Sequence, residues 1–364
     1  SGRSAKITLT VGSAVGTLEI RGASAVAQGK TITLNAVITP ATATNQKVIW
    51  SVDCGKDIAT IDRHGRLKAG KGLTAPVTIT VTAVGDGSTT ITVNCAAGTN
   101  HNAPGSKTVS VNVQMANPDL SKNDPSTIKA AAQSGQAKNL WSVGDKTPIA
   151  INGKVGALTI NGTYYAIILG FDHNSSVEGG NSIHFQIGKD ANGKDIAFVD
   201  SEYLDTGSSA AFRMNTSNTN SGGWNNSYMR KTICPAFLAA LPTAWQNIIA
   251  ACTKYSDNTG DGSNTASYVT ATSDKIWLLS EMEVQGTRSY ANSAEANYQK
   301  QYDYYKNGNS KVKYQHTATT SACFWWLRSV YASYTYVFCF VGTDGSADLN
   351  FAYISNGFAP GFDI

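Results

Sequence analysis

Two histidines are the first candidates for chemistry in this sequence. His173 lies in the segment Gly-Phe-Asp-His-Asn and His184 in Ile-His-Phe. A transition-metal site read from sequence needs a second His, Cys or carboxylate at a helical or turn spacing. Neither histidine has one, and the residues around His184 alternate as they do in a strand. The sequence therefore predicts structural histidines and no metal site.

An acidic loop offers a second possibility. Asp257, Thr259 and Asp261, followed by Gly262, resemble the opening of a calcium loop. An EF-hand needs a bidentate Glu at its twelfth position, and Tyr268 holds that position here. The sequence favours a flexible Asn/Gly/Asp loop over a calcium site.

Glu281 and Glu283 have the spacing of two carboxylates on one face of a strand, which a glycosidase could use. No third catalytic partner accompanies them, and the motifs of serine hydrolases, zinc proteases and P-loop enzymes are absent. We expect one satisfied carboxylate near a buried turn and one in solvent. No catalytic residue and no cofactor is predicted.

The cysteines indicate core packing more than redox chemistry. No pair has the Cys-x-x-Cys spacing of a zinc knuckle or a thioredoxin-like site. Cys252 ends an apolar run, and Cys323 and Cys339 stand among aromatic residues, so all three are expected to be buried thiols. A disulfide between Cys54 and Cys95 is left open.

Composition excludes several classes of protein. Charged residues make up 15% of the chain, against about 25% in an average soluble domain, so Asn, Ser, Thr, Gly and Tyr must supply the polar surface. The net charge of +4 is unclustered, and we expect no nucleic-acid partner. No apolar run of about 18 residues exists, which predicts no membrane span. The start at Ser1 is interpreted as a vector remnant or a processed end that hides any targeting signal.

Residues 6–114 have the sequence pattern of an all-β sandwich: short runs that alternate apolar and polar residues, separated by Gly, Pro, Asn and Asp. Strands are expected near 25–27, 31–34, 48–52, 77–81 and 109–113, with Trp50 filling the space between the sheets. Five sequence words, in order, resemble the group 2 bacterial Ig-like domain: GKTITL from 29, VIWS from 48, IATID from 58, GRLKAG from 65 and VTITVTA from 77. The resemblance implies a spacer or adhesive module of surface proteins and phage tail fibres.

The second half mixes helical and strand periods and predicts an α+β domain. A linker is expected at 115–120 and a short helix at 128–133. Further helices are expected at 228–241 and 244–255, on either side of Pro242. Strands are expected at 149–151, 164–169, 275–279, 322–328, 336–341 and 351–354.

The last 40 residues place large apolar side chains where a strand–loop–strand unit should carry polar ones. Trp325, Trp326 and Leu327 form a core strand with Arg328, whose charge needs a partner. Beyond them a turn at Asp344 is flanked by aromatic residues interleaved with polar ones. An exposed aromatic patch of this kind usually marks a binding site. Eleven positions are predicted to contact a ligand: Tyr334, Tyr336, Val337, Phe340, Gly342, Asp348, Leu349, Asn350, Phe351, Tyr353 and Ile354.

Residues 120–364 resemble the C-type-lectin-fold variable proteins of diversity-generating retroelements, found in gut bacteria and their phages. The words that carry this resemblance are WSVGD from 141, GFDH from 170, GGW from 222, WLLSE from 277, WLRS from 326 and APGF from 359. In such systems the adenines of a template are randomised, so Asn codons become mixed codons. All eleven positions hold residues that such codons can encode. The calcium-binding motifs of sugar-binding lectins are absent, so calcium-dependent sugar chelation is not implied.

These observations predict a multidomain chain, with a bacterial Ig-like domain at 1–115 and a C-type-lectin-like domain at 116–364 whose variable region covers about 329–358. The expected function is non-catalytic binding of a protein or glycan receptor on a host or neighbouring cell, by a protein of the phage virion or the bacterial surface. Two alternatives stay open. One is an oxidase on the formylglycine-generating fold that uses Cys323 and Cys339, and the other is a purely structural tail or cell-surface protein.

Overall fold

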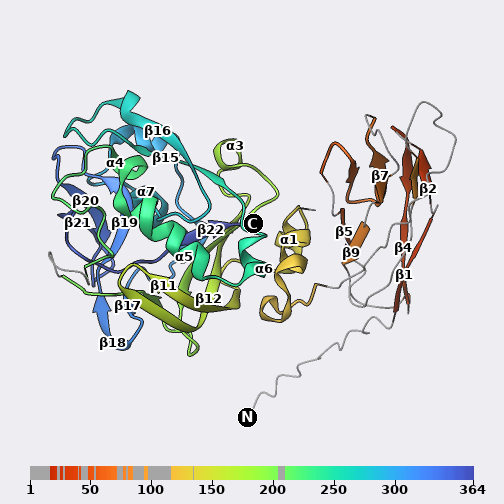
Figure 1. Cartoon of the computed structure of the whole chain (residues 1–364), viewed down its shortest axis with the longest axis horizontal. Coiled ribbons are helices and arrows are strands. Elements are labelled where there is room, and N and C mark those ends of the chain that lie inside the picture. Colours follow the sequence, from red (N-terminus) through yellow and green to blue (C-terminus); the bar gives the residue numbers. More distant parts are fainter. Residues whose placement is uncertain are drawn as a thin grey trace, which may run out of the picture. The chain divides into compact units, whose positions relative to one another are not determined.

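The computed structural model describes residues 17–22, 25–27, 29–39, 41, 48–52, 55–71, 77–78, 81–84, 94–96, 116–133, 135–203 and 210–364. The chain divides into two compact units (Figure 1). The first consists of residues 1–118 and 127–136, and the second of residues 119–126 and 137–364. Helix α1 (Pro125–Gln133) contains residues of both sets.

In its described residues, the first unit has short strands in four small sheets, with the strand orders β1-β4, β2-β10-β8, β3-β7-β6 and β5-β9. Trp50 on β5 packs in its core with Ile20, Leu34 and Leu67, as expected from the sequence. Gly65 faces Trp50 at a φ of +73°, and a Cβ there would lie 2.2 Å from the carbonyl oxygen of Leu34. The strands are β1 Thr17–Arg21, β2 Ala25–Ala27, β3 Thr31–Thr33, β4 Asn35–Thr39, β5 Ile49–Val52, β6 Ala59–Ile61, β7 Arg66–Ala69, β8 Val77–Thr78, β9 Val81–Val84 and β10 Asn94–Ala96.

The chain is thus multidomain and rich in β-strands. The strand expected at 109–113 and the Cys54–Cys95 disulfide that the sequence leaves open lie outside the residues whose side chains the structure describes.

A four-stranded antiparallel sheet of order β11-β12-β13-β22 is the largest in the described part of the second unit. Strands β11 (Lys146–Val155) and β12 (Leu158–Phe171) form a long hairpin that contains both strands expected in this segment. Strand β13 (Ile183–Lys189) pairs with β12. The C-terminal strand β22 (Gly361–Asp363) completes the sheet by pairing with β13, with His184 opposite Asp363.

The predicted helix at 228–241 is a π-helical turn, η2 (Met229–Ile233), continued by α5 (Cys234–Ala240). The helix predicted at 244–255 is wrong beyond its first turn. Helix α6 (Thr243–Gln246) is short, and Cys252–Asp257 forms strand β15, paired with β16 (Val269–Asp274). Spacings of three and four among Trp245, Ile248, Ile249 and Cys252 suit a helix, but the pairing with β16 places Cys252 on a strand instead.

Two further strand predictions are only partly right. Of the segment 275–279, only Trp277 makes a β-bridge, with Gly361. The segment expected at 351–354 is the last residue of a strand followed by a turn.

The other described elements of the second unit are η1 Leu120–Lys122, α2 Ala137–Leu140, α3 Ser175–Glu178, β14 Ile196–Ala197, α4 Gly223–Asn226, η3 Ala266–Tyr268, α7 Glu281–Gln285, η4 Ser293–Asn297, α8 Asp303–Lys306, β17 Lys313–Gln315, β18 Ala318–Cys323, β19 Trp325–Val330, β20 Val337–Val341 and β21 Ala347–Phe351. In the described part of the chain, no helix is long and apolar enough to span a membrane.

Candidate functional site

The predicted binding residues gather on an antiparallel sheet of order β19-β20-β21. Strands β20 and β21 form a hairpin in which Val337 stands opposite Phe351 and Phe340 opposite Asp348. The turn between them lies where the sequence predicts it. Gly345 has a φ of +85°, and Asp344 Oδ1 accepts hydrogen bonds from the backbone N–H and the hydroxyl of Ser346. Backbone and turn chemistry therefore fix the register of this hairpin.

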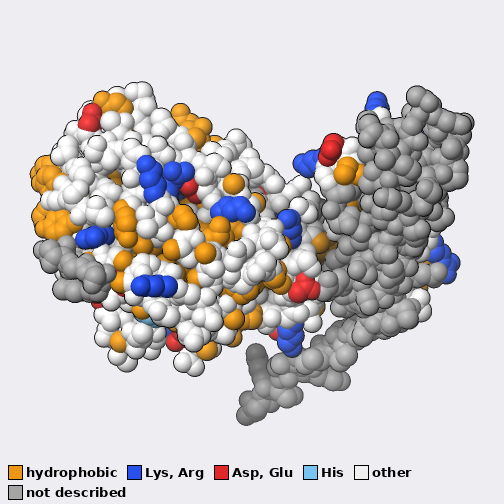
Figure 2. Space-filling view, in the orientation of Figure 1, with side chains coloured by type: hydrophobic (Ala, Val, Ile, Leu, Met, Phe, Trp, Pro, Cys, Tyr) orange, Lys and Arg blue, Asp and Glu red, His pale blue; other side chains and the backbone are white. Residues whose placement is uncertain are grey.

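An aromatic strip, defined here as Tyr331, Tyr334, Tyr336, Phe351 and Tyr353, runs along the outside of the hairpin. The rings of Tyr334 and Tyr336 stack with centroids 5.3 Å apart, those of Tyr336 and Phe351 at 5.8 Å, and those of Phe351 and Tyr353 at 6.0 Å. Tyr331 meets Tyr334 edge to face. Figure 2 shows hydrophobic side chains gathered at the edge of the second unit over β20 and β21.

The strip reaches solvent at two anchors. Tyr334 is 50% exposed and Phe351 is 43% exposed. Only one other large hydrophobic side chain among the described residues, Tyr203, is comparably exposed. Both anchors belong to the positions singled out from the sequence, and stacking on their neighbours limits the rotamers they can adopt.

The eleven predicted positions separate into three groups by burial. Tyr334, Asp348 and Phe351 are exposed. A second group is half-buried: Tyr336, Leu349, Asn350, Tyr353 and Ile354. A third group is buried: Val337, Phe340 and Gly342. Their neighbours Phe338, Cys339 and Ala352 are fully buried, as the sequence predicts for Cys339.

The expected exposure of Phe340 is wrong, because this side chain is only 4% exposed. Strand β20 is the central strand of its sheet, and all five of its residues are buried. The Phe340 ring packs 4.6 Å from that of Phe324 and edge-on to Trp326 at 6.4 Å. Both faces of β20 are covered, so of the two hairpin strands only the edge strand β21 has exposed side chains.

Asn220 holds the loop that presents the first part of the strip. Its buried side-chain amide donates to the carbonyl oxygens of Tyr334, at 2.7 Å, and Val337, at 2.9 Å. Its backbone N–H donates to the carbonyl oxygen of Thr335. Sequence reasoning missed this residue, although it directly precedes the Ser-Gly-Gly-Trp segment, whose glycines adopt positive φ.

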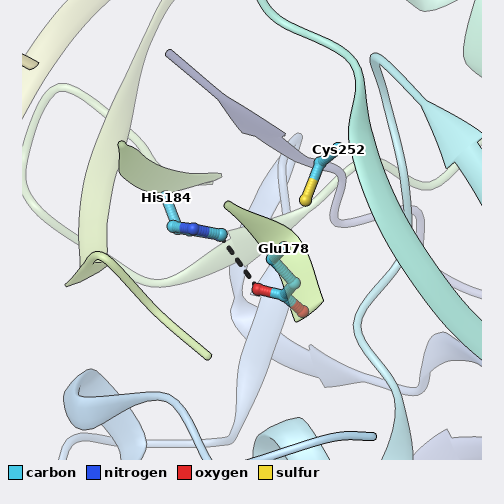
Figure 3. Close-up of side chains that lie close together, drawn as sticks. All are labelled: Glu178, His184 and Cys252. Carbon is cyan, nitrogen blue, oxygen red and sulfur yellow. Dashed lines mark ion pairs between the residues drawn. The ribbon is translucent and has the colours of Figure 1, made fainter. Parts of the chain in front are cut away.

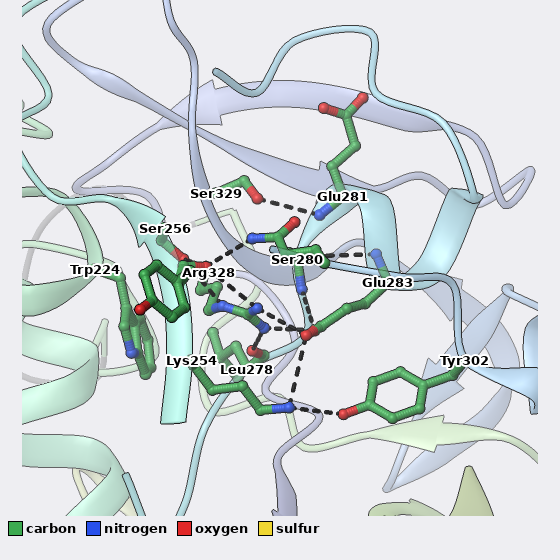
Figure 4. Close-up of polar contacts among 12 residues, drawn as sticks. Trp224, Lys254, Ser256, Leu278, Ser280, Glu281, Glu283, Tyr302, Arg328 and Ser329 are labelled. Atoms are coloured by element: carbon green, nitrogen blue, oxygen red, sulfur yellow. Dashed lines mark hydrogen bonds and ion pairs between the residues drawn. The ribbon is translucent and has the colours of Figure 1, made fainter. Parts of the chain in front are cut away.

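On β19, the strand that pairs with β20, Arg328 lies in a buried ionic network (Figure 4). Its Nη1 and Nη2 donate to the two carboxylate oxygens of Glu283, and Nη1 also donates to the carbonyl oxygen of Leu278 at 2.7 Å. Its Nε donates to the hydroxyl of Ser256 at 3.0 Å. Arg328 and Glu283 are both fully buried. The partner that the sequence requires for the Arg328 charge is therefore Glu283.

Burial alone would raise the pKa of Glu283, but the charges of Arg328 and Lys254 outweigh it and hold the pKa below its usual range. Lys254 is fully buried as well. Its Nζ lies 3.0 Å from Glu178 Oε1 and 3.6 Å from Glu283 Oε1, and it donates to the Tyr302 hydroxyl at 2.8 Å. A bidentate pair of this type fixes side-chain geometry rigidly, so it ties strand β19 to helix α7.

Comparison with known families assigns the N-terminal region. Residues 15–103 match the family model described as bacterial Ig-like domain (group 2). The N-terminal region is a bacterial Ig-like domain. Residues 195–364 match a second family model, described as a domain of unknown function (DUF6273). That DUF6273 region contains Asn220, Arg328 and all eleven predicted positions. No curated protein matches the chain.

Within the DUF6273 region, the side chains of Glu281 and Glu283, both on helix α7, are fully buried. The expected solvent carboxylate is therefore wrong. Glu281 accepts hydrogen bonds from the backbone N–H groups of Ser289, Tyr290 and Ala291 and thereby closes a loop. Glu283 also accepts from the N–H of Ser280, as half of a capping box. The two carboxylates face different partners and do not form a pair.

The two histidines lie together, with ring centroids 5.5 Å apart. The His173 ring stacks on Tyr302 at 3.8 Å, and burial lowers the pKa of His173 to about 3, so this side chain is neutral at pH 7. His184 is fully buried next to Glu178 and Asp363. Residues from distant segments surround both rings, and the local spacing in the sequence does not reveal them.

The thiols of Cys323 and Cys339 are free and fully buried. Burial raises the pKa of Cys323 to about 12 and that of Cys339 well above its usual range. In the acidic loop, Asp257 Oδ1 accepts from the N–H groups of Thr259 and Gly260, and Asp261 Oδ1 accepts from the N–H of Ser263. These carboxylate oxygens are turned toward their own backbone.

Proposed function

We propose that this chain is a non-catalytic binding protein and that the aromatic strip is the surface that contacts its ligand. The observation that carries this proposal is the stacked row from Tyr334 to Tyr353, exposed at Tyr334 and Phe351, on a hairpin whose strand β20 is also paired with β19. A rigid sheet lets the exposed side chains differ without a change in the backbone.

Tyrosine and phenylalanine suit such a surface energetically. Each offers a large contact area with two χ angles, so little side-chain entropy is lost when a partner is bound. Stacking with Tyr336 already restricts the anchors Tyr334 and Phe351 before any ligand arrives. Tyr336 and Tyr353 add hydroxyl groups that can form hydrogen bonds at the edge of the contact.

A protein is the favoured class of ligand. The rings of the strip lie nearly parallel to their neighbours, with interplanar angles of 10°, 29° and 24° along the row. Stacked rings cover part of one another's faces. A sugar ring would need an open aromatic face, whereas a protein surface can bind to edges and hydroxyls.

The finer proposal is that the second unit has a C-type-lectin-like fold and that its surface positions are diversified by a retroelement, on a phage particle or a bacterial surface. The sequence resemblance and the codon-compatible residues support it. The exposed or half-buried state of Tyr334, Tyr336, Asp348, Phe351 and Tyr353 supports it as well. A near-copy of the last hundred or so bases, differing at adenines and lying beside a reverse transcriptase gene, is the genetic observation expected.

The oxidase alternative receives less support. A reactive thiol needs a lowered pKa and an open approach, whereas the Cys323 and Cys339 thiols are fully buried with raised pKa values.

Binding of the labelled full chain to a panel of intact bacterial strains tests the proposal. The double variant Tyr334→Ala/Phe351→Ala should lose binding, because a hot-spot aromatic contributes about 2 kcal/mol or more, or roughly 30-fold in Kd. Tyr165→Ala, which truncates a half-buried tyrosine on strand β12, is the matched control and should bind as the parent does. Unchanged binding by the double variant would refute the role of the strip. Loss of binding after periodate treatment of the cells, but not after protease treatment, would replace the protein ligand by a glycan.

A further inference from the structure

Four segments distant in the sequence bring metal-ligating atoms together inside the second unit. Glu178 ends helix α3, His184 lies on β13, Cys252 begins β15 and Asp363 lies on the C-terminal strand β22. The ligand atoms of Glu178, His184 and Cys252 all lie within 4.8 Å of one another. Figure 3 shows these three side chains pointing toward one another. His184 Nδ1 is 3.7 Å from Glu178 Oε2 and 2.9 Å from Asp363 Oδ1.

One of these atoms lacks the hydrogen-bond donor that a buried acceptor normally has. Glu178 Oε2 is buried and makes no hydrogen bond to any described residue. Asp363 Oδ1 lies 2.9 Å from His184 Nδ1, which is also 3.1 Å from the Tyr302 hydroxyl. The side chains of Glu178 and Asp363 are both at least nine-tenths buried, with 2% and 5% of their surface exposed. A carboxylate oxygen left unsatisfied in a dry interior is costly, unless a cation binds to it.

The interior around these atoms is rich in charge. Three buried carboxylates, Glu178, Glu283 and Asp363, lie next to Lys254, Arg328 and His184. The thiol of Cys252 can serve as a ligand there, because a metal deprotonates a coordinating thiol outright.

We propose that Glu178, His184, Cys252 and Asp363 form a buried binding site for a divalent transition metal, with Zn²⁺ as the ion best matched to one sulfur, one imidazole nitrogen and two carboxylate oxygens. Zinc takes these ligands tetrahedrally at about 2.0–2.3 Å, which places ligand atoms roughly 3.3–3.7 Å apart. The separation of Glu178 Oε2 and His184 Nδ1 is 3.7 Å, within this range, whereas Asp363 Oδ1 and His184 Nδ1, at 2.9 Å, would have to move apart by a few tenths of an ångström to bind one ion.

A second group of possible ligands, His173, Glu178 and Glu283, is less suitable. The Lys254 ammonium lies 3.0 Å from Glu178 Oε1 and 3.6 Å from Glu283 Oε1, so a cation already occupies that side. The other carboxylate oxygen of Glu178 faces His184. Glu178 therefore separates the ammonium from the metal site.

The role of the ion would be structural. It would bind α3, β13, β15 and β22 to one centre and so fix the C-terminal strand, whose Phe362 stacks on Phe185. With four protein ligands the site is closed and has no open position for a substrate, as in structural zinc sites generally. The site is separate from the proposed ligand-binding strip and does not depend on it.

Metal content and cobalt spectroscopy of the full chain test the site. Protein produced in zinc-supplemented medium should retain one equivalent of zinc per chain after gel filtration, measured by inductively coupled plasma mass spectrometry. Protein produced with cobalt should show a thiolate-to-cobalt charge-transfer band. Cys252→Ala should remove the band, whereas Cys234→Ala, at another buried free thiol, should keep it. Circular dichroism establishes that each variant is folded.

Glu178→Gln provides a second measurement that keeps the thiol. It should retain the cobalt–thiolate band but weaken metal affinity by more than the roughly 10–100-fold that loss of an outer-shell partner costs. Folded protein that holds no stoichiometric metal would overturn the proposal. A charge-transfer band that survives in Cys252→Ala, or that disappears equally in Cys234→Ala, would also overturn it.

Discussion

Removal of the Arg328 charge should destabilise the second unit more than removal of a charge from an exposed ion pair. In Arg328→Met, the aliphatic stem stays while the guanidinium is lost. Glu283 then keeps its charge in the core, with Lys254 as the nearest remaining cation at 3.6 Å. The carbonyl oxygen of Leu278 and the hydroxyl of Ser256 lose their donors as well.

Breaking a buried ion pair by removing one partner costs about 3–5 kcal/mol, because the other charge is left uncompensated. Both side chains here are fully buried, so the full range applies. A domain is stable by about 5–15 kcal/mol in total. At roughly 2–4 °C per kcal/mol for a unit of this size, the midpoint of thermal unfolding should fall by about 6–20 °C.

The matched control is Lys138→Met. Lys138 pairs with Asp172 at 3.0 Å, but its side chain is 57% exposed, and an exposed pair contributes about 0.2–1 kcal/mol. Urea unfolding followed by tryptophan fluorescence reports on the second unit, which contains all the tryptophans except Trp50. Addition of Glu283→Gln to Arg328→Met should recover part of the loss. A cost below about 1 kcal/mol for Arg328→Met, or an equal cost for Lys138→Met, would refute the reasoning.

Two further changes test the polar interior. Burial raises the pKa of Glu295 to about 7 from an ordinary value of about 4.5, so the folded unit binds this proton more tightly than the unfolded chain. The stability that this tighter proton binding contributes is fully present below about pH 4.5, and about 3 kcal/mol of it is lost as the pH rises through 7. Urea midpoints measured from pH 5 to 8 should therefore fall with pH for the parent but not for Glu295→Gln. Equal slopes in the two proteins would contradict this. Ser280→Ala removes the N-cap of α7, because the Ser280 hydroxyl accepts a hydrogen bond from the Glu283 N–H at 3.1 Å. The variant should lose about 1 kcal/mol of stability in the same urea assay. No change in stability would show that the cap is dispensable.

Local patterns predicted the first unit well and the second only in part. The Ig-like half is encoded by alternation and turn residues, which act over a few neighbouring positions. In the second half, the segment from Trp245 to Cys252 carries helical spacing, yet the pairing of Cys252–Asp257 with β16 decides its structure. Spacing alone cannot separate a buried helix from a buried strand over so short a segment.

From the sequence, the buried polar groups could be recognised only as charged residues whose partners were unknown. The sequence predicts that the Arg328 charge needs a partner, but Glu283 lies 45 positions away and is one of several carboxylates that could serve. Glu178, Lys254 and Asp363 are ordinary surface types by composition, and no motif marks them. Their burial arises from the way β13, β15 and β22 are assembled. A fold is needed before such a cluster can be recognised.

The burial of three predicted positions sharpens the diversification proposal into a tolerance test. Each of the eleven positions can be randomised singly in the full chain at the first two bases of an Asn codon, and folded variants recovered by resistance to protease. Tyr334, Asp348 and Phe351 should accept most of the encoded residues, because exposed sites vary within about ±0.5 kcal/mol. Deep sequencing before and after selection gives the tolerance of each site.

Val337 and Phe340 should be restricted in that selection. They are 5% and 4% exposed on the central strand β20, and truncation of such side chains costs about 2–5 kcal/mol, a large part of the stability of a domain. Phe340 fills the space between Phe324 and Trp326, which no smaller encoded residue can fill. If Val337 and Phe340 vary as freely as Phe351, the hairpin does not depend on a fixed central strand, and the separation into a constant β20 and a variable β21 is wrong. If they do not, natural variants of this protein should differ on β21 and in the flanking aromatic loop while Val337 and Phe340 stay apolar.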